Sequence, residues 1–586
     1  MKFLSNVLAT IVGLFVFIIL FFFGIIFLVA VFGGEAETIA VKKNSVIELD
    51  IKKIKYDYAG KYTDPWITLL ADDKTIGLSD VIDAIEAAKT DDDIKGISIL
   101  NNESSLGMAQ TKNLRDALES FKKSGKFVLA YANSYSQKEY YLNSVANTIY
   151  LNPVGEMEFK GLSSEVLFFK DLQEKTGIKM EVIRHGKYKS AVEPFLDDKM
   201  SDANREQITG LLNTIWTGIC SDISKSRNIP YAKLNEIANG LLARTPQMAK
   251  EQKLVDIVAY EDVYHNDIKK ALKVDQNEDY NKVSIFDYTK KFITTSIISE
   301  TENKIAVIFA QGDIQSGEGD VNTIGEVSIK RSLKEARNND NIKAVVLRID
   351  SPGGNALTSD LIWREIELTK KVKPVVVSMG NYAASGGYYI ACNANTIFAE
   401  ENTITGSIGV FGILPNLSQL TKKIGINVEQ VKTHDNAAGY SPFVPMDETF
   451  KTVTTESIER VYNTFISHVA EGRKMTFAQV DDIAQGRVWS GAEAIKIKLV
   501  DKIGGLNDAI AEAAALSKTK NYTTKTYPEY EKDLNDILSG LPFSESKENL
   551  IKEEIGLENY RLLQEVKKFQ SQKGVQAMMP FQITIF

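Results

Sequence analysis

Short apolar runs alternate with stretches of helical spacing over most of the chain. The pattern is clearest in the second half, where it predicts strands at 304–314, 342–350, 373–380 and 395–400 and helices at 356–371 and 387–394. The helix at 356–371 follows a glycine-rich turn. Strands that alternate with helices in this way indicate an α/β fold with largely parallel sheets.

One apolar stretch, residues 7–32, is long enough to cross a membrane. It carries no charge over 26 positions, and a helix needs roughly 20 apolar residues to span a bilayer. It exceeds the about 7–15 apolar residues of a cleaved signal peptide, so we expect a retained anchor. Lys2 precedes it and Glu35 follows it, which favours a cytoplasmic N-terminus and an exported main body. A buried helix of a soluble domain is the alternative.

The chain repeats itself. The segment at 93–100 reads DIKGISIL and that at 341–348 reads NIKAVVLR, while 140–150 reads YYLNSVANTIY and 388–398 reads YYIACNANTIF. Both pairs are offset by 248 positions. The segment KLVD also recurs, at 253–256 and 498–501, with an offset of 245 positions. A near-constant offset over about 160 residues indicates two copies of one domain.

These repeats predict five parts of the chain. We expect an anchor over 1–34, a first repeat domain over 45–266, a connector over 267–303, a second repeat domain over 304–517 and a C-terminal part over 518–586. The last part is predicted to contain a helix at 547–570. Its apolar end, 573–586, is expected to dock as a strand or subunit contact, or to enter an active-site groove as a pseudo-substrate that contains Ala577.

Composition excludes several classes of function. The chain has 69 basic and 77 acidic residues and no long basic run with interleaved aromatics, so nucleic acid is not an expected partner. Cys220 and Cys392 are far apart and form no ligand motif, so both are expected to be small core residues. Four scattered histidines give no pattern for a metal site. We therefore expect neither a metal nor another cofactor.

Ser385 stands among Ala and Gly residues in NYAASGGYY, residues 381–389, directly after a predicted strand. Its counterpart in the first copy, 248 positions earlier, is Gln137. The glycine pair of DSPGG, residues 350–354, is also missing from the first copy, which reads NESSL at 102–106. Only the second copy therefore carries a candidate nucleophile beside a glycine-rich turn.

Lys189 shows the opposite asymmetry. It lies in RHGKYKSAVEPF, residues 184–195, and its counterpart in the second copy is Ala437. The first copy has the lysine without the serine, and the second has the serine without the lysine. We therefore expect the two copies to form one active site together. A neutral lysine can take the proton of a serine hydroxyl if burial lowers its pKa from about 10.4 to roughly 7–8.

The same loops offer donors for an oxyanion. The two glycines after Pro352 lie at a predicted strand-to-helix turn and provide backbone N–H groups. Gly386, directly after the candidate nucleophile, provides another. Each of these features has a plainer interpretation as a turn residue or a solvated lysine, and Lys187 is expected to be such a lysine. A Ser-His-Asp triad through His434 is a further alternative, but His185 matches His434 in the copy without the serine, so both are interpreted as structural.

Four motifs in this order, GKYKSAVEPF, DSPGG, YAASGGYYIA and TGSIGVFG, resemble the signal peptide peptidase A family, also called protease IV, in its long tandem form. The resemblance covers roughly residues 45–515 and the anchor. It implies that Ser385 is the nucleophile and Lys189 the general base. It further implies that Ser407 hydrogen-bonds the lysine and that Gly354 and Gly386 surround the oxyanion.

The resemblance also implies a fold similar to Clp-type proteases and crotonases and a bowl-shaped homotetramer. The implied function is a serine protease held in the cytoplasmic membrane by a single span. Its catalytic part would lie on the extracytoplasmic side and digest cleaved signal peptides. Two rival functions remain open at this point, an acyl-transfer enzyme on a crotonase-like scaffold and a membrane scaffold whose sites have decayed.

Overall fold

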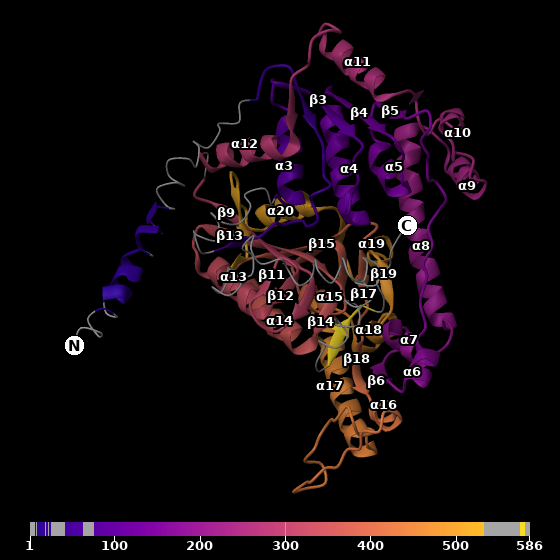
Figure 1. The fold of residues 1–586 in the computed structure, drawn as a ribbon, viewed down its shortest axis with the longest axis vertical. Helices are drawn as coiled ribbons and strands as arrows, with labels where there is room; N and C mark the ends of the chain where they lie inside the picture. Colours follow the sequence, from indigo (N-terminus) through magenta and orange to yellow (C-terminus); the bar gives the residue numbers. More distant parts are fainter. Residues whose placement is uncertain are drawn as a thin grey trace. The chain divides into compact units, whose positions relative to one another are not determined.

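The computed structural model describes residues 41–62, 76–298, 301–531 and 575–579, and near the N-terminus residues 6, 9–17, 19–21 and 23–24. The chain divides into an N-terminal unit, Met1–Lys42, and a main unit, Lys43–Phe586. The main unit contains both copies of the repeat (Figure 1). The helix predicted at 547–570 lies outside the described residues.

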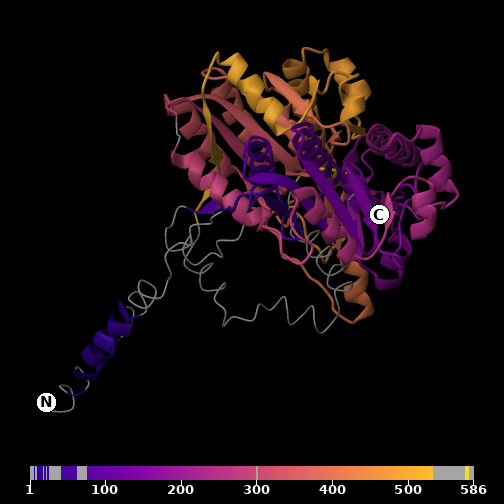
Figure 2. The ribbon, with the colours of Figure 1, turned by 90° about the horizontal axis from the view of Figure 1, so that it is seen from above.

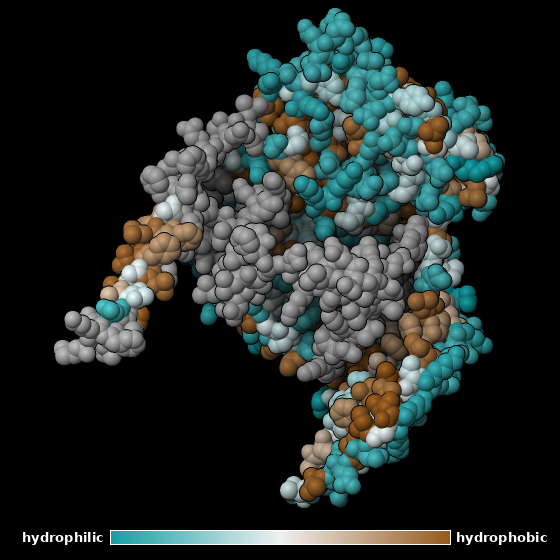
Figure 3. Space-filling model, viewed as in Figure 1, coloured by the Kyte–Doolittle hydropathy of each residue, from teal (hydrophilic) through white to brown (hydrophobic). Residues whose placement is uncertain are grey.

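The described residues of the N-terminal unit between positions 6 and 24 are helical. Its apolar side chains are exposed, with Leu14, Phe17 and Leu20 each more than 60 % accessible (Figure 3). Within the described residues, no helix combines the length and the apolarity needed to cross a membrane. Much of the stretch 7–32 lies outside those residues, so the anchor stays a prediction.

The first copy is built on a sheet of six parallel strands in the order β7-β5-β4-β3-β1-β8. The strands are β1 (Ser45–Glu48), β3 (Ile94–Leu100), β4 (Phe127–Ala132), β5 (Thr148–Leu151), β7 (Ile257–Val258) and β8 (Lys282–Ser284). Its helices are α3 (Leu78–Ala88), α4 (Met108–Lys123), α5 (Gln137–Asn143), α6 (Lys170–Thr176), α7 (Glu193–Leu196), α8 (Asp202–Arg227), α9 (Tyr231–Asn239) and α10 (Pro246–Glu251).

The second copy has a corresponding sheet in the order β19-β17-β15-β13-β9-β21. Its strands are β9 (Lys304–Gln311), β13 (Ile342–Ser351), β15 (Val375–Ala384), β16 (Thr396–Ala399), β17 (Ile404–Gly406), β19 (Val488–Ser490), β20 (Lys502–Ile503) and β21 (Thr523–Tyr527). All are parallel except the pair β17 and β19. The α/β fold with parallel sheets is confirmed.

The helices of the second copy cover both faces of this sheet because its central strands are apolar on both faces. On β13, Val345, Leu347 and Ile349 pack in one core cluster with α14, while Val346 packs in another with α20. The helices are α13 (Glu326–Asn338), α14 (Ala356–Lys370), α15 (Gly386–Ala391), α16 (Ser418–Lys423), α17 (Glu448–Arg473), α18 (Phe477–Ile483), α19 (Gly491–Ala494) and α20 (Leu506–Leu516).

A third sheet joins the two copies. Its order is β11-β12-β10-β14-β23-β18-β6, and it contains β6 (Lys179–His185), β10 (Asp313–Gln315), β11 (Gly319–Asp320), β12 (Thr323–Gly325), β14 (Gly353–Asn355), β18 (Val410–Asn416) and β23 (Gln576–Met578). β6 belongs to the first copy and pairs antiparallel with β18 of the second, from His185 opposite Val410 to Lys179 opposite Asn416. In Figure 2 the first copy, indigo to magenta, lies beside the orange elements of the second.

The segment 267–303, expected as a connector, is more ordered than its mixed sequence indicated. It contains the end of α11 (Glu261–Leu272), then β8 and α12 (Ile285–Ile298). β8 pairs in parallel with β1, so this segment completes an edge of the first sheet. After the second copy, β21 extends the second sheet beside β9, and β22 (Glu529–Tyr530) pairs with β2 (Lys61–Tyr62).

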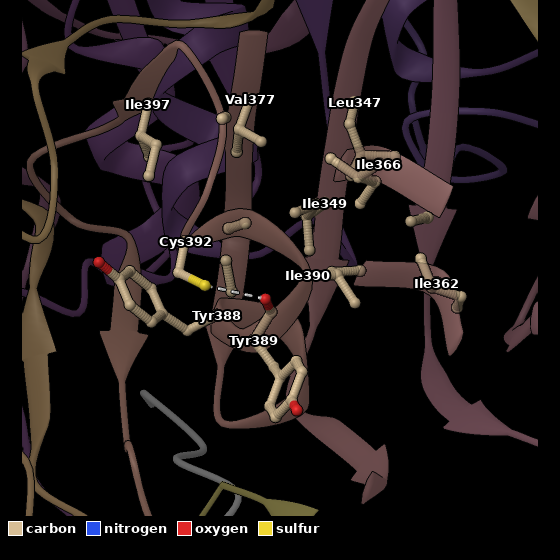
Figure 4. Close-up of a cluster of buried hydrophobic side chains, with 14 of the residues drawn as sticks. Leu347, Ile349, Ile362, Ile366, Val377, Tyr388, Tyr389, Ile390, Cys392 and Ile397 are labelled. Carbon is tan, nitrogen blue, oxygen red and sulfur yellow. Dashed lines mark hydrogen bonds between the residues drawn. The ribbon is translucent and has the colours of Figure 1, made fainter. Parts of the chain in front are cut away.

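The short helix α15 is anchored in the main core. Figure 4 shows its Tyr388, Tyr389 and Ile390 among aliphatic side chains from β13, β15 and α14. The Tyr388 hydroxyl donates to the Leu499 carbonyl at 2.9 Å. Because α15 starts directly after Ser385, this packing fixes the position of the predicted nucleophile.

Candidate active site

Lys189 lies four positions after His185, the last residue of β6, where the first copy reaches the second. It precedes a turn of 3-10 helix, Ser190–Val192, and its side chain is 0 % exposed. The loop at Gly486 of the second copy packs directly on it, since a Cβ at Gly486 would lie 2.7 Å from Lys189 Cβ. The cross-copy pairing of β6 with β18 therefore carries the lysine into the second copy.

Ser385 lies at a strained turn between β15 and α15. Its φ of 55° falls in a region that residues other than glycine rarely adopt, which is common at functional sites. Its N–H donates to the Gly406 carbonyl and its carbonyl accepts from Tyr389 N–H, both at 2.8 Å. The turn is therefore held from β17 and from α15, and the side chain is fully buried.

Three predicted residues meet at one point. Lys189 Nζ lies 2.9 Å from Ser385 Oγ and 3.0 Å from Ser407 Oγ, and it contacts the Ser407 carbonyl oxygen at 3.2 Å. Ser407 is itself held in a left-handed conformation, φ 48°, by its N–H bond to the Arg487 carbonyl. The hydroxyls of Ser385 and Ser407 therefore both lie within hydrogen-bonding distance of the Lys189 amine.

Burial lowers the pKa of Lys189 well below its usual value because the ammonium form is removed from water. Its side-chain nitrogen lies 5.8 Å from the centre of the Phe411 ring, so an aromatic side chain borders the site. A neutral amine 2.9 Å from a serine hydroxyl can accept its proton. A buried amine beside a serine hydroxyl is the geometry that a Ser–Lys dyad requires.

A slot one strand wide lies in the third sheet, and the chain's own C-terminal segment fills it. β23 lies between β14 and β18, antiparallel to both, with Ala577 opposite Gly354 and Gln576 opposite Phe411. The pairing uses main-chain groups of both neighbours. An extended peptide of another sequence can make the same bonds, as in β-strand addition.

The carbonyl of Ala577 points at the glycines of both predicted loops. Two flanking pairs of this ladder are hydrogen-bonded, Ala356 N–H to Val575 O at 3.2 Å and Met579 N–H to Pro352 O at 2.6 Å. Because such pairs recur at every second residue, Gly354 N–H faces the Ala577 oxygen. A Cβ would lie 3.0 Å from the same oxygen if built on Gly386, and 2.1 Å if built on Gly353.

Gly353 is a residue that the sequence interpretation did not single out from the glycine pair. Its φ of 105° and its close approach to the Ala577 carbonyl both require glycine. The signal in the sequence is the glycine pair of DSPGG itself. The sequence alone does not show which of the two glycines approaches the Ala577 carbonyl, because that depends on the pairing of β23 with β14.

The alternative residues lie elsewhere. His434 is exposed and contacts Thr433 Oγ1 at 3.1 Å, while the His185 ring stacks on Tyr462 at 3.9 Å between centroids. Lys187 is exposed, as predicted. Cys220 and Cys392 are buried free thiols, as predicted. Among the described residues, no cluster of His, Cys, Asp or Glu is arranged to hold a metal ion.

Comparison with known proteins identifies the family. Residues 120–275 and 367–520 each match peptidase family S49. The chain belongs to peptidase family S49. The two matches begin 247 positions apart and end 245 positions apart, close to the offset of the internal repeats, so each copy contains one S49 domain.

The relatives of this S49 peptidase include long proteases. It is 37 % identical to Protease 4 of Haemophilus influenzae over 77 % of this chain and 74 % of the relative. It is 36 % identical to Protease 4 of Salmonella typhi, covering 79 % and 76 %, and 34 % identical to the chloroplastic serine protease SPPA of Arabidopsis thaliana, covering 78 % and 68 %. The predicted resemblance is confirmed, and the protein is a serine protease.

Proposed function

We propose that this S49 peptidase is a membrane-anchored endopeptidase that uses a Ser385–Lys189 dyad to degrade cleaved signal peptides and similar apolar peptides. The observation that carries the proposal is the 2.9 Å approach of the buried Lys189 amine to Ser385 Oγ, beside a slot that holds an extended peptide. The lysine comes from the first copy and the serine from the second.

The proposed reaction starts with neutral Lys189, which removes the proton of Ser385 as Oγ attacks the carbonyl carbon of the scissile bond. The negative charge that develops on the carbonyl oxygen is stabilised by the N–H groups of Gly354 and Gly386. The Lys189 ammonium then gives its proton to the leaving amine, and the C–N bond breaks. A water molecule, deprotonated by Lys189 in the same way, hydrolyses the ester and regenerates Ser385.

The peptide in the slot supports the proposed substrate class. Side chains of an extended strand alternate between faces, which places Val575, Ala577 and Met579 on one face. Ala577 is 0 % exposed, and Val575 packs against the main core cluster. A site with these neighbours favours a small residue before the scissile bond and an apolar residue two positions earlier. Signal peptides contain both kinds of residue, because they have an apolar central region and small residues at the cleavage site.

The proposed location rests on the N-terminal stretch 7–32, with the peptidase domains outside the cytoplasm. A protease added to spheroplasts should then digest residues 45–586, while the bulk of the chain would stay protected if the domains were cytoplasmic. A homotetramer, which the family resemblance implies, belongs to the same proposal. Its test is the molar mass of the detergent-solubilised protein.

The test of the function is hydrolysis of a fluorogenic apolar peptide by the wild type and by Ser385→Ala. We expect the variant to lose several orders of magnitude in kcat, because the members of a catalytic unit fail together. Its fold should stay intact, as shown by an unchanged Tm. Retained turnover by Ser385→Ala would overturn the assignment.

A further inference from the structure

The strand that carries Ser385 is irregular just before the serine. Along β13 and β15, Ile349 pairs with Met379, but the next pair is Ser351 with Ala383. One residue of β13 therefore lies opposite the three residues 380–382 of β15, which form a β-bulge. Bulges redirect the chain beyond them, so the position of Ser385 depends on the shape of this bulge.

Asp350 is the residue of β13 opposite the bulge, and both of its carboxylate oxygens bind it. Oδ1 accepts from the Tyr382 N–H at 2.9 Å, and Oδ2 accepts from the Asn381 side-chain amide at 3.0 Å. Gly380 lets the carboxylate approach, since a Cβ there would lie 2.9 Å from Asp350 Cγ. The Asp350 side chain therefore contacts all three residues of the bulge.

The first copy holds the other side of the bulge. Gln110, in the first turn of α4, donates its N–H to Asn381 Oδ1 at 3.2 Å. A Cβ at Gly107 would lie 2.3 Å from the same oxygen. The Asn381 side chain can therefore contact the N-terminus of α4 only because residue 107 is glycine. The side-chain amide of Asn381 therefore bridges Asp350 of the second copy and α4 of the first.

A buried ion pair extends this link to the start of the bulge. Asp57 of the first copy binds Gln110 Nε2 at 2.9 Å and Arg348 Nε at 2.6 Å. Arg348 in turn donates to the Met379 carbonyl at 2.7 Å, the last residue before the bulge. Both ends of the bulge are therefore tied to the first copy.

The repeat offers an internal comparison. At the offset of 248, Asn102 stands in the first copy where Asp350 stands in the second. Asn102 accepts from Ile51 N–H at 3.0 Å, and its own amide nitrogen has no partner among the described residues, although the side chain is only 5 % exposed. The copy without a nucleophile thus lacks the carboxylate and its bonds to the neighbouring strand.

We infer that Asp350 is a positioning residue for the reaction, which holds the 380–382 bulge so that Ser385 meets Lys189, and that the first copy stabilises the same bulge through Asn381. The first copy then does more than supply the lysine. The inference rests on the proposed Ser–Lys chemistry, and it assigns Asp350 no contact with substrate.

The test compares Asp350→Asn, which mimics the first copy, with Asn381→Ala and with Asp340→Asn, an exposed residue near the start of β13. We expect kcat for peptide hydrolysis to fall about 100-fold in Asp350→Asn and about 10-fold in Asn381→Ala, because misplacement by about 1 Å can cost this much. KM should stay within about threefold in both, since the slot is unchanged. Asp340→Asn should match the wild type.

The double variant Asp350→Asn/Asn381→Asp separates positioning from general damage. It exchanges donor and acceptor across the 3.0 Å contact and keeps an acceptor for the Tyr382 N–H. We expect it to recover at least about tenfold in kcat over Asp350→Asn, because the exchange restores the bond to the bulge.

An Asp350→Asn protein with wild-type kcat, or a loss that appears in KM alone, would overturn the inference. A double variant without recovery would do the same. If Asp350→Asn does not fold, Asn381→Ala decides by the same kinetic criteria. These results are distinct from failure of the proposed function, in which Ser385→Ala would retain the activity of the wild type.

Discussion

Lys189 Nζ and Ser385 Oγ lie 2.9 Å apart although 196 positions separate the two residues in the chain. The contact exists because β6 of the first copy pairs with β18 of the second. Each copy of the repeat contributes one of the two residues. In the proposed dyad, the lysine therefore comes from one copy and the serine from the other.

Replacement of Lys189 tests whether a base, rather than a cation, is needed. Lys189→Arg keeps a positive charge but cannot accept a proton near neutral pH, because the guanidinium pKa exceeds about 12. We expect it to be as inactive in peptide hydrolysis as Lys189→Ala. The matched control is Lys187→Ala, two residues away and exposed, which should retain most activity. Opposite phenotypes for the two lysines would mean that the dyad is misassigned.

The pH dependence follows from the direction of the Lys189 shift. Burial lowers its pKa, the neutral amine is the active form, and kcat/KM should therefore rise with pH through that lowered pKa. Removal from water and the charge of Asp57 raise the pKa of Asp350 to about 7, and its ionised form is the one that binds the bulge. Because acid protonates both Lys189 and Asp350, kcat/KM should fall more steeply on acidification than the titration of a single group would produce. His434→Ala should leave the pH profile of kcat/KM unchanged. A shift of that profile in His434→Ala would indicate that histidine is the base.

Removal of Ser407 Oγ should weaken the reaction without abolishing it. Ser407→Ala loses the 3.0 Å contact to Lys189 Nζ but keeps the backbone carbonyl at 3.2 Å. We expect kcat to fall about 10- to 100-fold, the scale of a single positioning hydrogen bond. Ser467→Ala, on the exposed side of α17, should behave as the wild type. Equal activity of the two variants would remove Ser407 from the site.

The C-terminal segment should inhibit the enzyme that carries it. Val575–Met579 fills the slot from within the same chain, where its effective concentration is high, so an added peptide must displace it. Deletion of 573–586 should raise peptide turnover at low substrate concentration. Ala577→Arg should have the same effect, because a large cation does not fit a position that is 0 % exposed. Unchanged rates in a deletion variant that still assembles would contradict this prediction.

Much of the second copy could be predicted from the sequence because its strands and helices follow local rules. The runs at 342–350 and 373–380 became β13 and β15, and Ser385 and Lys189 emerged as candidate residues when the two copies were compared at one offset. Several relationships could not be predicted, because they depend on pairings between distant segments. The sequence gives no local signal that β23 lies beside Gly354, or that Asn381 bridges Asp350 and Gln110.

The segment 267–303 shows the same limit. Its charged, mixed sequence lacks the apolar run of a central strand, because β8 is an edge strand with only partly buried side chains. Edge strands need fewer apolar residues than central ones, so hydrophobic pattern alone describes them poorly.

The activation of Ser385 by Lys189 is measured most directly by the rate at which a fluorophosphonate labels the protein, with the labelled residue mapped by mass spectrometry. Lys189→Met removes the amine but keeps a side chain of similar length for the buried site. The account predicts that the label is on Ser385, that its rate rises with pH in the wild type, and that Lys189→Met lowers the rate at least about 100-fold. A label on another residue, or a wild-type rate in Lys189→Met, would contradict it.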